Sequence, residues 1–293
     1  MLSTKNLLLP RFASLSIPIL SFVPSSIATD AFLSTSGSVL TEDSKKPLYR
    51  HQRQFTSATT AVNMDWSSIW DDILSGGYSR WKINDLSHKE HALDRIVRTA
   101  NSGEATEKSL EIFCPLAGDD KFVNYAWSKG HFVTSIDLVP KAVEAMRDQF
   151  PGGAKSWTRG SGPKSVVIWK HDSGRATLIE GDALADLSEV LGGAFDAVYD
   201  KDSFGALDKS MRDAYCDRIG KYTKKEAVIY LEVQLKSKDH PNRDAGPPFS
   251  LERDELMMES NFGSDFVYEE GLGEVFDIGW PMMKQTGHIL RRR

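Results

Sequence analysis

One stretch, residues 110–137, constrains the fold more than any other part of this 293-residue chain. It begins with an apolar run over residues 110–114, which has the length of a buried strand. A turn holding Gly118 follows, and residues 122–127 then place apolar side chains at helical spacing. A second apolar run ends on Asp137. This order predicts a βαβ unit with a right-handed connection.

Gly118 and Asp137 are the candidate ligand-binding residues of this unit. A glycine turn lets a ligand approach the backbone, and an acid about twenty residues further on can accept both hydroxyls of a ribose. The turn has one glycine instead of GxGxxG, and Asp119 and Asp120 would repel a pyrophosphate but not a sulfonium cation. The pattern therefore favours S-adenosylmethionine (SAM) over NAD. An NAD-dependent oxidoreductase, a SAM-type fold without turnover, and a unit with no ligand remain alternatives.

The composition excludes several other classes of protein. A net charge of −5 argues against a nucleic-acid-binding surface. Cys114 and Cys216 stand outside any CxxC or HExxH spacing, so we expect two reduced, buried thiols and no metal site. After residue 30 no apolar stretch is long enough to cross a membrane. We expect a monomer that acts on a small molecule, without nucleic-acid or membrane partners.

The first 63 residues differ in composition from the rest of the chain. They are rich in serine and threonine, their first acid is Asp30, and an apolar stretch over residues 13–28 ends in a small-residue sequence typical of cleavage sites. This composition favours a plastid or mitochondrial leader, either single or bipartite, with a disordered tail as the alternative. We therefore place the folded domain at residues 64–293, and expect a cytoplasmic protein if the leader is not functional.

Residues 114–146, CPLAGDDKFVNYAWSKGHFVTSIDLVPKAVEAM, resemble the first motif of the thiopurine S-methyltransferases and the related halide/thiol methyltransferases. The shared features are a strand ending in Pro-Leu-x-Gly, a helix, and a Gly-His pair before a strand that ends in an acid. Further matches extend the resemblance roughly from Trp66 to the C-terminus. It implies an α/β, Rossmann-like domain with a seven-stranded, mostly parallel sheet, helices on both faces and a hairpin extension.

The resemblance also implies residues that hold the cofactor. Leu116 and Gly118 belong to the Pro-Leu-x-Gly turn, and an aromatic pair, Trp70 and Trp81, corresponds to a segment that folds over the bound cofactor. An aromatic face beside a sulfonium offers a cation–π contact. Two core tryptophans are the alternative. The family often has another aromatic residue where Leu74 stands, so Trp66 can take that place or the contact is absent.

Two further segments extend the expected site. Asp182 and Ala183 correspond to the turn that holds the adenine, although Asp182 is equally suited to cap a helix over residues 184–190. Asp200 and Lys201 correspond to the segment beside the transferring methyl group. The family carries an arginine where this chain has Lys201, and a lysine cannot reproduce its planar fork. An exposed pairing of Lys201 with Asp200 or Asp202 is the alternative.

The acceptor is expected to be a small sulfur compound. The hairpin over residues 166–180 and the sequence Gly-Pro-Pro-Phe at residues 246–249 resemble the thiopurine side of the family, and the second of these is expected to form a wall of the acceptor pocket. A cation at Lys201 would draw an anionic thiolate or a carboxylate-bearing thioether. Methylation of a halide, or of a thioether to a sulfonium, is the alternative. Nothing in the sequence is a convincing general base, and His88 and Asp200 are weak candidates.

Overall fold

The structure is a computed structural model that describes residues 66–77, 79, 82–102 and 108–293. All of these belong to one compact unit, Ala61–Arg293. The expected leader, the domain boundary at residue 64 and Trp81 lie outside the described residues.

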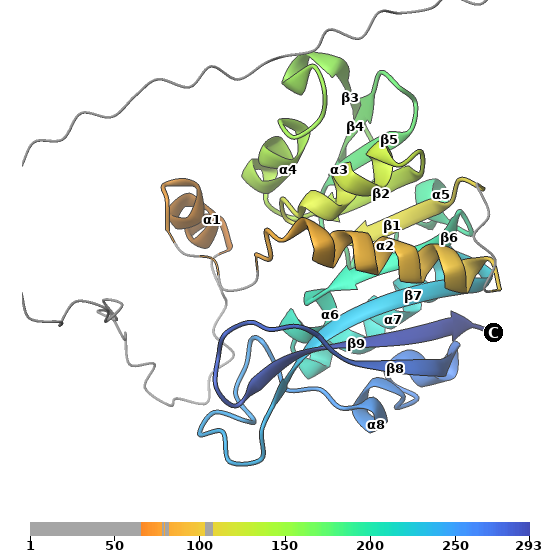
Figure 1. Ribbon diagram of the computed structural model, residues 1–293. Coiled ribbons are helices and arrows are strands. Elements are labelled where there is room, and N and C mark those ends of the chain that lie inside the picture. Colours follow the sequence, from red (N-terminus) through yellow and green to blue (C-terminus); the bar gives the residue numbers. More distant parts are fainter. Residues whose placement is uncertain (1–65, 78, 80–81, 103–107) are drawn as a thin grey trace, which may run out of the picture. The chain divides into compact units, whose positions relative to one another are not determined.

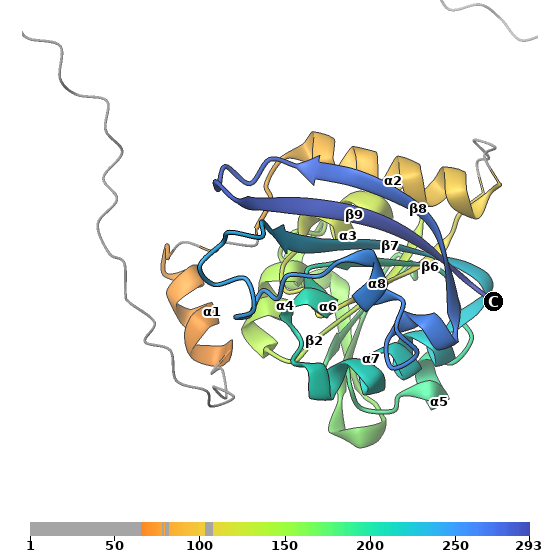
Figure 2. The same cartoon turned by 90° about the horizontal axis from the view of Figure 1, so that it is seen from below.

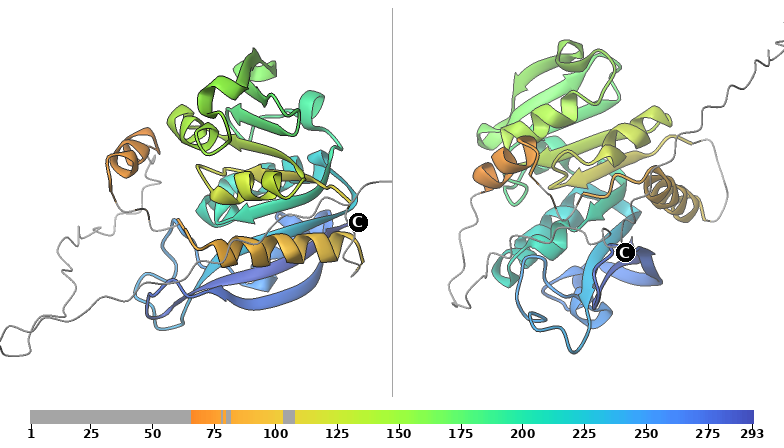
Figure 3. Two further views of the ribbon diagram at one scale, coloured as in Figure 1. Left: turned by 45° about the horizontal axis from the view of Figure 1, so that its top comes forward. Right: turned by 60° about the vertical axis from the view of Figure 1, so that its left-hand side comes forward.

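A single nine-stranded sheet organises this unit, with the strand order β3-β4-β5-β2-β1-β6-β7-β9-β8 (Figure 1). Its centre is parallel and comprises β1 (Glu111–Pro115), β2 (Phe132–Asp137), β5 (Ala176–Glu180), β6 (Phe195–Lys201) and β7 (Thr223–Lys236). Antiparallel strands extend both ends, namely β3 (Trp157–Ser161) and β4 (Val167–His171) at one and β8 (Phe266–Phe276) and β9 (Met283–Arg292) at the other (Figure 3).

The expected seven-stranded, mostly parallel sheet is thus corrected to a nine-stranded mixed one. The predicted hairpin is confirmed as β4 and β5, but β4 joins the main sheet because the outer edge of β5 is open to it. β3 then pairs with β4 and forms the outermost strand at this end of the sheet. Four of the five β3 residues are exposed, so this strand lacks the apolar alternation by which a strand is predicted.

Helices cover both faces of the sheet (Figure 2). One face carries α2 (Leu86–Ala100), α3 (Lys121–Ser128) and α4 (Pro140–Arg147), while α5 (Ser188–Leu191), α6 (Ser203–Ala206), α7 (Lys209–Tyr222) and α8 (Arg253–Leu256) lie on the other. α1 (Trp66–Leu74) contacts α4. Three short 3-10 turns complete the elements, η1 (Gly153–Ser156), η2 (Pro163–Ser165) and η3 (Phe262–Ser264). No helix among the described residues is long and apolar enough to cross a membrane.

Strand β1 shows why the centre of the sheet reads as continuous apolar runs. Ile112 and Cys114 pack among the side chains of α2, α3 and α4, whereas Phe113 packs among those of α7. A parallel strand is buried on both faces, so both sets of positions must be apolar. Cys114 and Cys216 are buried and unpaired, which confirms the expectation of two reduced thiols.

Local signals decide where the helices near the strand ends begin. Asp120 caps α3 by accepting a hydrogen bond from the Phe122 N–H (2.8 Å), and Pro140 is the first residue of α4. Ser250 does not cap the helix that follows it. Its hydroxyl accepts the Lys236 N–H instead (3.0 Å), and α8 begins three residues later.

Candidate active site

The turn after β1 has the backbone geometry that the sequence predicts. Gly118 has a φ of +56°, and a side chain there would be strained. Leu116 also has a positive φ, +44°, which is uncommon for a residue with a Cβ. Such strain concentrates at functional sites, because the surrounding structure must hold it in place. The turn therefore presents backbone to the space above the strand ends.

Trp70 lies directly against this turn. A Cβ placed on Gly118 would meet the Trp70 ring at 2.8 Å, so the glycine permits the contact. Trp70 is buried and packs with Val139 and Ala142 at the start of α4, and the Lys82 ammonium lies 4.9 Å from its ring centroid. The structure thus brings Trp70 to the expected cofactor turn, and at the same time gives it the core packing that was the alternative.

Asp137 links the turn to the end of β2. Its Oδ2 accepts the Gly118 N–H (2.8 Å) and its Oδ1 accepts the Val139 N–H (2.9 Å). Burial raises the pKa of Asp137, against the opposing effect of these two N–H groups. A carboxylate has about four lone-pair sites, so each oxygen keeps capacity for a further hydrogen bond. The residues present therefore fit a ribose whose two hydroxyls donate to Asp137.

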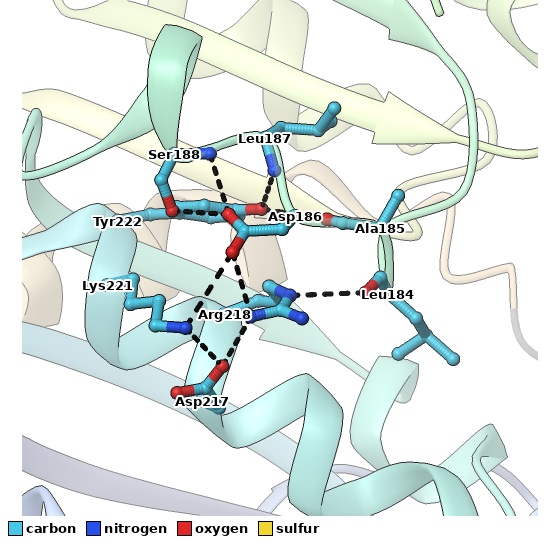
Figure 4. Close-up of polar contacts among 9 residues, drawn as sticks. All are labelled: Leu184, Ala185, Asp186, Leu187, Ser188, Asp217, Arg218, Lys221 and Tyr222. Atoms are coloured by element: carbon cyan, nitrogen blue, oxygen red, sulfur yellow. Dashed lines mark hydrogen bonds and ion pairs between the residues drawn. The ribbon is translucent and has the colours of Figure 1, made fainter. Parts of the chain in front are cut away.

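The loop after β5 holds Asp182 and Ala183 and is fastened to α7 (Figure 4). The Tyr222 hydroxyl donates to the Ala185 carbonyl (3.0 Å) and accepts the Leu187 N–H (2.8 Å), and the Arg218 Nε donates to the Leu184 carbonyl (3.2 Å). These contacts with α7 hold the loop in position.

The helix expected over residues 184–190 is shorter than predicted. Asp182 accepts the Leu184 N–H (2.9 Å) but caps only a turn, because Asp186 accepts the Ser188 N–H (3.0 Å) and α5 begins there. Asp182 itself is exposed, so its carboxylate is open to a ligand.

Asp200 is buried beneath the site, with both of its carboxylate oxygens engaged. Oδ1 accepts the N–H groups of Ser203 (3.0 Å) and Phe204 (3.2 Å), and Oδ2 accepts the Tyr215 hydroxyl (2.6 Å). Burial raises the pKa of Asp200 to about 6, although these hydrogen bonds oppose the shift. The geometry makes Asp200 an anchor for the start of α6.

Lys201 is the last residue of β6, and its side chain leaves the face of the sheet opposite to that of Asp200. Its ammonium lies 2.9 Å from Asp202 Oδ2. This pairing was the expected alternative, but it is buried, since the Lys201 side chain is only 4% exposed. Burial alone would lower the pKa of Lys201, but the carboxylates of Asp202, Asp120 and Glu232 together raise it. The lysine charge is therefore compensated by three neighbouring acids.

The acids after Gly118 also have cationic partners, which the sequence did not reveal. Asp119 lies 2.5 Å from the Lys82 ammonium, and Asp120 lies 3.8 Å from that of Lys89. These contacts weaken the argument that the two acids alone would exclude a pyrophosphate. The single glycine remains as the sequence evidence for SAM over NAD.

Glu232 and Gln285 are further polar residues of this region that carry no sequence motif. Glu232 is fully buried on β7, with its Oε1 2.8 Å from His88 Nε2 on α2. The Gln285 Nε2 lies 3.3 Å from Glu232 Oε2 and 3.0 Å from Asp202 Oδ1. The only sequence signal that could have found Glu232 and Gln285 is that each is a polar residue within the apolar pattern of a strand.

The Gly-Pro-Pro-Phe segment at residues 246–249 lies against α6. The Phe249 N–H donates to the Gly205 carbonyl (2.9 Å). The Arg212 guanidinium lies 5.1 Å from the Phe249 ring centroid and 5.2 Å from that of Phe204. Arg212 also pairs with Glu255 of α8 (2.7 Å), so it connects α6, this segment and α8.

The residues expected to hold the cofactor follow the carboxyl ends of neighbouring parallel strands. Gly118 follows β1, Asp137 ends β2, Asp182 follows β5 and Lys201 ends β6. This edge is where open α/β sheets bind ligands. Among the described residues, no group of three or more histidine, cysteine or acidic side chains is arranged to hold a metal.

Solved structures with the same fold are SAM-dependent methyltransferases. A putative sarcosine dimethylglycine methyltransferase from Galdieria sulphuraria matches with a TM-score of 0.52 and 10% identity, over 77% of this chain and 97% of that one. The 1,6-didemethyltoxoflavin-N1-methyltransferase from Burkholderia thailandensis, solved with S-adenosylhomocysteine, matches with a TM-score of 0.50 and 16% identity, over 77% of this chain and 86% of that one. The α/β methyltransferase fold is therefore confirmed.

Curated relatives are thiopurine S-methyltransferases. One from Legionella pneumophila (strain Corby) is 25% identical over 67% of this chain and 91% of its own length, and one from Lycaon pictus is 29% identical over 60% and 69%. A third, from Stutzerimonas stutzeri, is 25% identical over 52% of this chain, which spans only 61% of its length.

The family model for thiopurine S-methyltransferase matches residues 75–270, which include every expected site residue except Trp70. With the relatives and the fold, this match confirms the predicted class of SAM-dependent S-methyltransferase and its cofactor. The chain belongs to the thiopurine S-methyltransferase family.

Proposed function

We propose that this protein transfers the methyl group of SAM to the sulfur of a small thiol. The observation that carries the proposal is the Asp137 carboxylate, which bonds the Gly118 and Val139 N–H groups and keeps lone pairs for a ribose. SAM, when bound, supplies an electrophilic methyl group on a sulfonium cation. The protein's own task is then to orient the two reactants and exclude water.

Each site residue has a proposed role in that task. Asp137 holds the ribose, while the backbone from Leu116 to Gly118 faces the rest of the cofactor. Asp182 and the Ala183 N–H contact the adenine edge. Trp70, and Trp81 from outside the described residues, cover the cofactor. Asp200 acts as a positioning residue, because its buried carboxylate anchors the start of α6.

The acceptor side is proposed to lie between Lys201 and the Gly-Pro-Pro-Phe segment. The contact of Phe249 with Gly205 supports this location, since it places the segment beside the end of β6. The expected attraction of Lys201 for an anionic acceptor is reduced by its acidic neighbours. A small sulfur compound remains the acceptor, with halides as weaker substrates.

We also propose that residues 1–63 act as an organelle leader and that the domain is a monomer. The support for the leader is the acid-poor, serine- and threonine-rich composition. A fusion of residues 1–63 to a fluorescent protein should enter plastids or mitochondria. A cytosolic signal would contradict the leader.

The activity is tested by incubating the protein with methyl-labelled SAM and a panel of alkyl thiols, aromatic thiols, thioethers and iodide. We expect labelled thioethers, with aromatic thiols as good surrogates. Iodide methylated faster than every sulfur compound would overturn the choice of acceptor. Tight NAD binding without SAM binding, measured by calorimetry, would overturn the whole proposal.

A further inference from the structure

A buried histidine–carboxylate pair beside the site has no role in the reaction as described so far. His88, in the first turn of α2, has its Nε2 2.8 Å from Glu232 Oε1 on β7, and the two side chains are 1% and 0% exposed. The two atoms lie within contact distance, but the contact is not a well-aligned hydrogen bond, since neither atom has a hydrogen-bond partner by geometry. Burying a carboxylate against a histidine carries a desolvation cost, so the pair contributes little to stability.

The pair lies next to the end of β6. Glu232 is the register partner of Lys201 across β6 and β7, so their side chains leave the same face of the sheet. Gln285 connects Glu232 to Asp202, the residue that pairs with the Lys201 ammonium. His88 is therefore within the polar cluster that surrounds Lys201.

The charges of this cluster argue against an acceptor that arrives as an anion. With His88 neutral, three acids (Asp120, Asp202 and Glu232) stand against two ammonium groups (Lys89 and Lys201), a net charge of −1. Such a field stabilises a sulfonium and an imidazolium, and it disfavours a thiolate that must enter from water. A neutral thiol meets no such barrier.

The free nitrogen of His88 can accept a proton. Nε2 faces the carboxylate, so its proton is best placed there, which leaves the lone pair of the imidazole on Nδ1. Nδ1 is buried and has no hydrogen-bond partner among the described residues. A buried polar atom without a partner needs an explanation, and a substrate that donates to it is one. The Phe276 ring flanks the imidazole in a T-shaped arrangement (5.5 Å between centroids).

We propose that His88, held by Glu232, takes the proton of a neutral thiol acceptor, an inference that rests on the proposed methyl transfer. As the acceptor sulfur forms its bond to the methyl carbon, the S–H proton passes to His88 Nδ1. The bond from the methyl carbon to the cofactor sulfur breaks, and its electron pair returns to that sulfur. The products are a neutral thioether, neutral S-adenosylhomocysteine and an imidazolium paired with Glu232, in the manner of carboxylate–histidine pairs elsewhere.

The test compares two acceptors that differ in whether a proton must leave. Mercaptoethanol is a neutral thiol at pH 7, whereas para-nitrothiophenol is already a thiolate. His88→Gln should lower kcat/KM for mercaptoethanol by roughly 10²–10⁴-fold, the usual contribution of a general base, and leave that for para-nitrothiophenol nearly unchanged. His91→Gln, an exposed histidine on the same helix, is the matched control and should leave both unchanged. Equal losses on both acceptors, or no loss on either, would overturn the proposal.

The pH profile of the unmodified protein gives a second measurement, which does not depend on a variant folding. With a base at His88, kcat/KM for mercaptoethanol should level off at a pH below the ionisation of the thiol itself. Without a base, kcat/KM should keep rising toward the ionisation of the thiol itself, above pH 8. Such a rise would overturn the inference. Other charged and titratable groups surround the His88–Glu232 pair and contribute to its field. They are Asp85, Lys89, Arg95, Asp120, Lys201, Asp202 and Tyr230.

The same assays separate the two proposals from each other. Methylation of para-nitrothiophenol tests the proposed function without any need for a base. If this thiolate is methylated but kcat/KM for mercaptoethanol does not depend on His88, the proposed methyl transfer is supported and the proposed role of His88 is wrong. If neither thiol is methylated, both proposals fail.

Discussion

At the residue scale, Asp137 has two tasks that one substitution would remove together. Asp137→Ala should weaken SAM binding by about 1–3 kcal/mol, because a buried hydrogen-bond acceptor for the ribose is lost and the turn at Gly118 loses its anchor. Calorimetry with SAM measures the change. Asp148→Ala, an exposed acid at the end of α4, is the control. Unchanged affinity in Asp137→Ala would place the ribose elsewhere.

Asp200 makes stability depend on pH in the direction opposite to a salt-bridged acid. Burial raises its pKa from 3.8 to about 6, so the folded state binds the proton more tightly than the unfolded state. The contribution of Asp200 to the free energy of unfolding should therefore be highest below pH 3.8. It should fall by about 3 kcal/mol as the pH rises to 6, and stay level above.

Asp200→Asn should abolish that decline. The amide oxygen can still accept the Ser203 and Phe204 N–H groups, and its NH₂ can donate to the Tyr215 oxygen. Urea unfolding of both proteins between pH 4 and pH 7 measures the effect, with the variant gaining relative stability as the pH rises. Parallel curves would mean that Asp200 does not titrate in this range.

At the scale of elements, α7 holds the segment expected to line the acceptor pocket. Arg212→Lys removes a planar guanidinium from between Phe204 and Phe249. If this contact is worth about 1–2 kcal/mol, KM for the thiol should rise roughly 5- to 30-fold while SAM affinity is kept. Steady-state kinetics and calorimetry separate the two quantities.

The neighbouring cation of the same helix is the control for this variant. Lys209 is exposed and lies 4.0 Å from Glu255, so Lys209→Ala should change neither quantity. Equal effects of Arg212→Lys on SAM and thiol would indicate a general loss of structure instead of a local role in the acceptor wall.

At the scale of the whole molecule, residues 64–293 should behave as an independent domain. A chain that begins at Met64 keeps every described contact, including the packing of Trp70 on the start of α4. It should therefore match the full chain in melting temperature and SAM affinity. Aggregation, or loss of SAM binding, would show that the preceding residues belong to the domain.

The parallel centre of the sheet could be predicted because its signals are local. Residues 110–137 show two buried strands and the capped helix between them, and each boundary follows from a few neighbouring residues. The edges could not be predicted in the same way. β3 is largely exposed and owes its existence to pairing with β4, a partner supplied by the rest of the fold.

The sequence by itself determined the βαβ unit, the acid at the end of β2 and the resemblance that names the family. Only the tertiary structure decided which charges compensate one another. Lys201 meets Asp202, Asp120 and Glu232, and Glu232 meets His88, which is separated from it by more than a hundred residues of sequence. Local geometry comes from neighbours along the chain, and a motif records it. Electrostatic balance depends on distances through space, which exist only once the sheet and its helices have assembled.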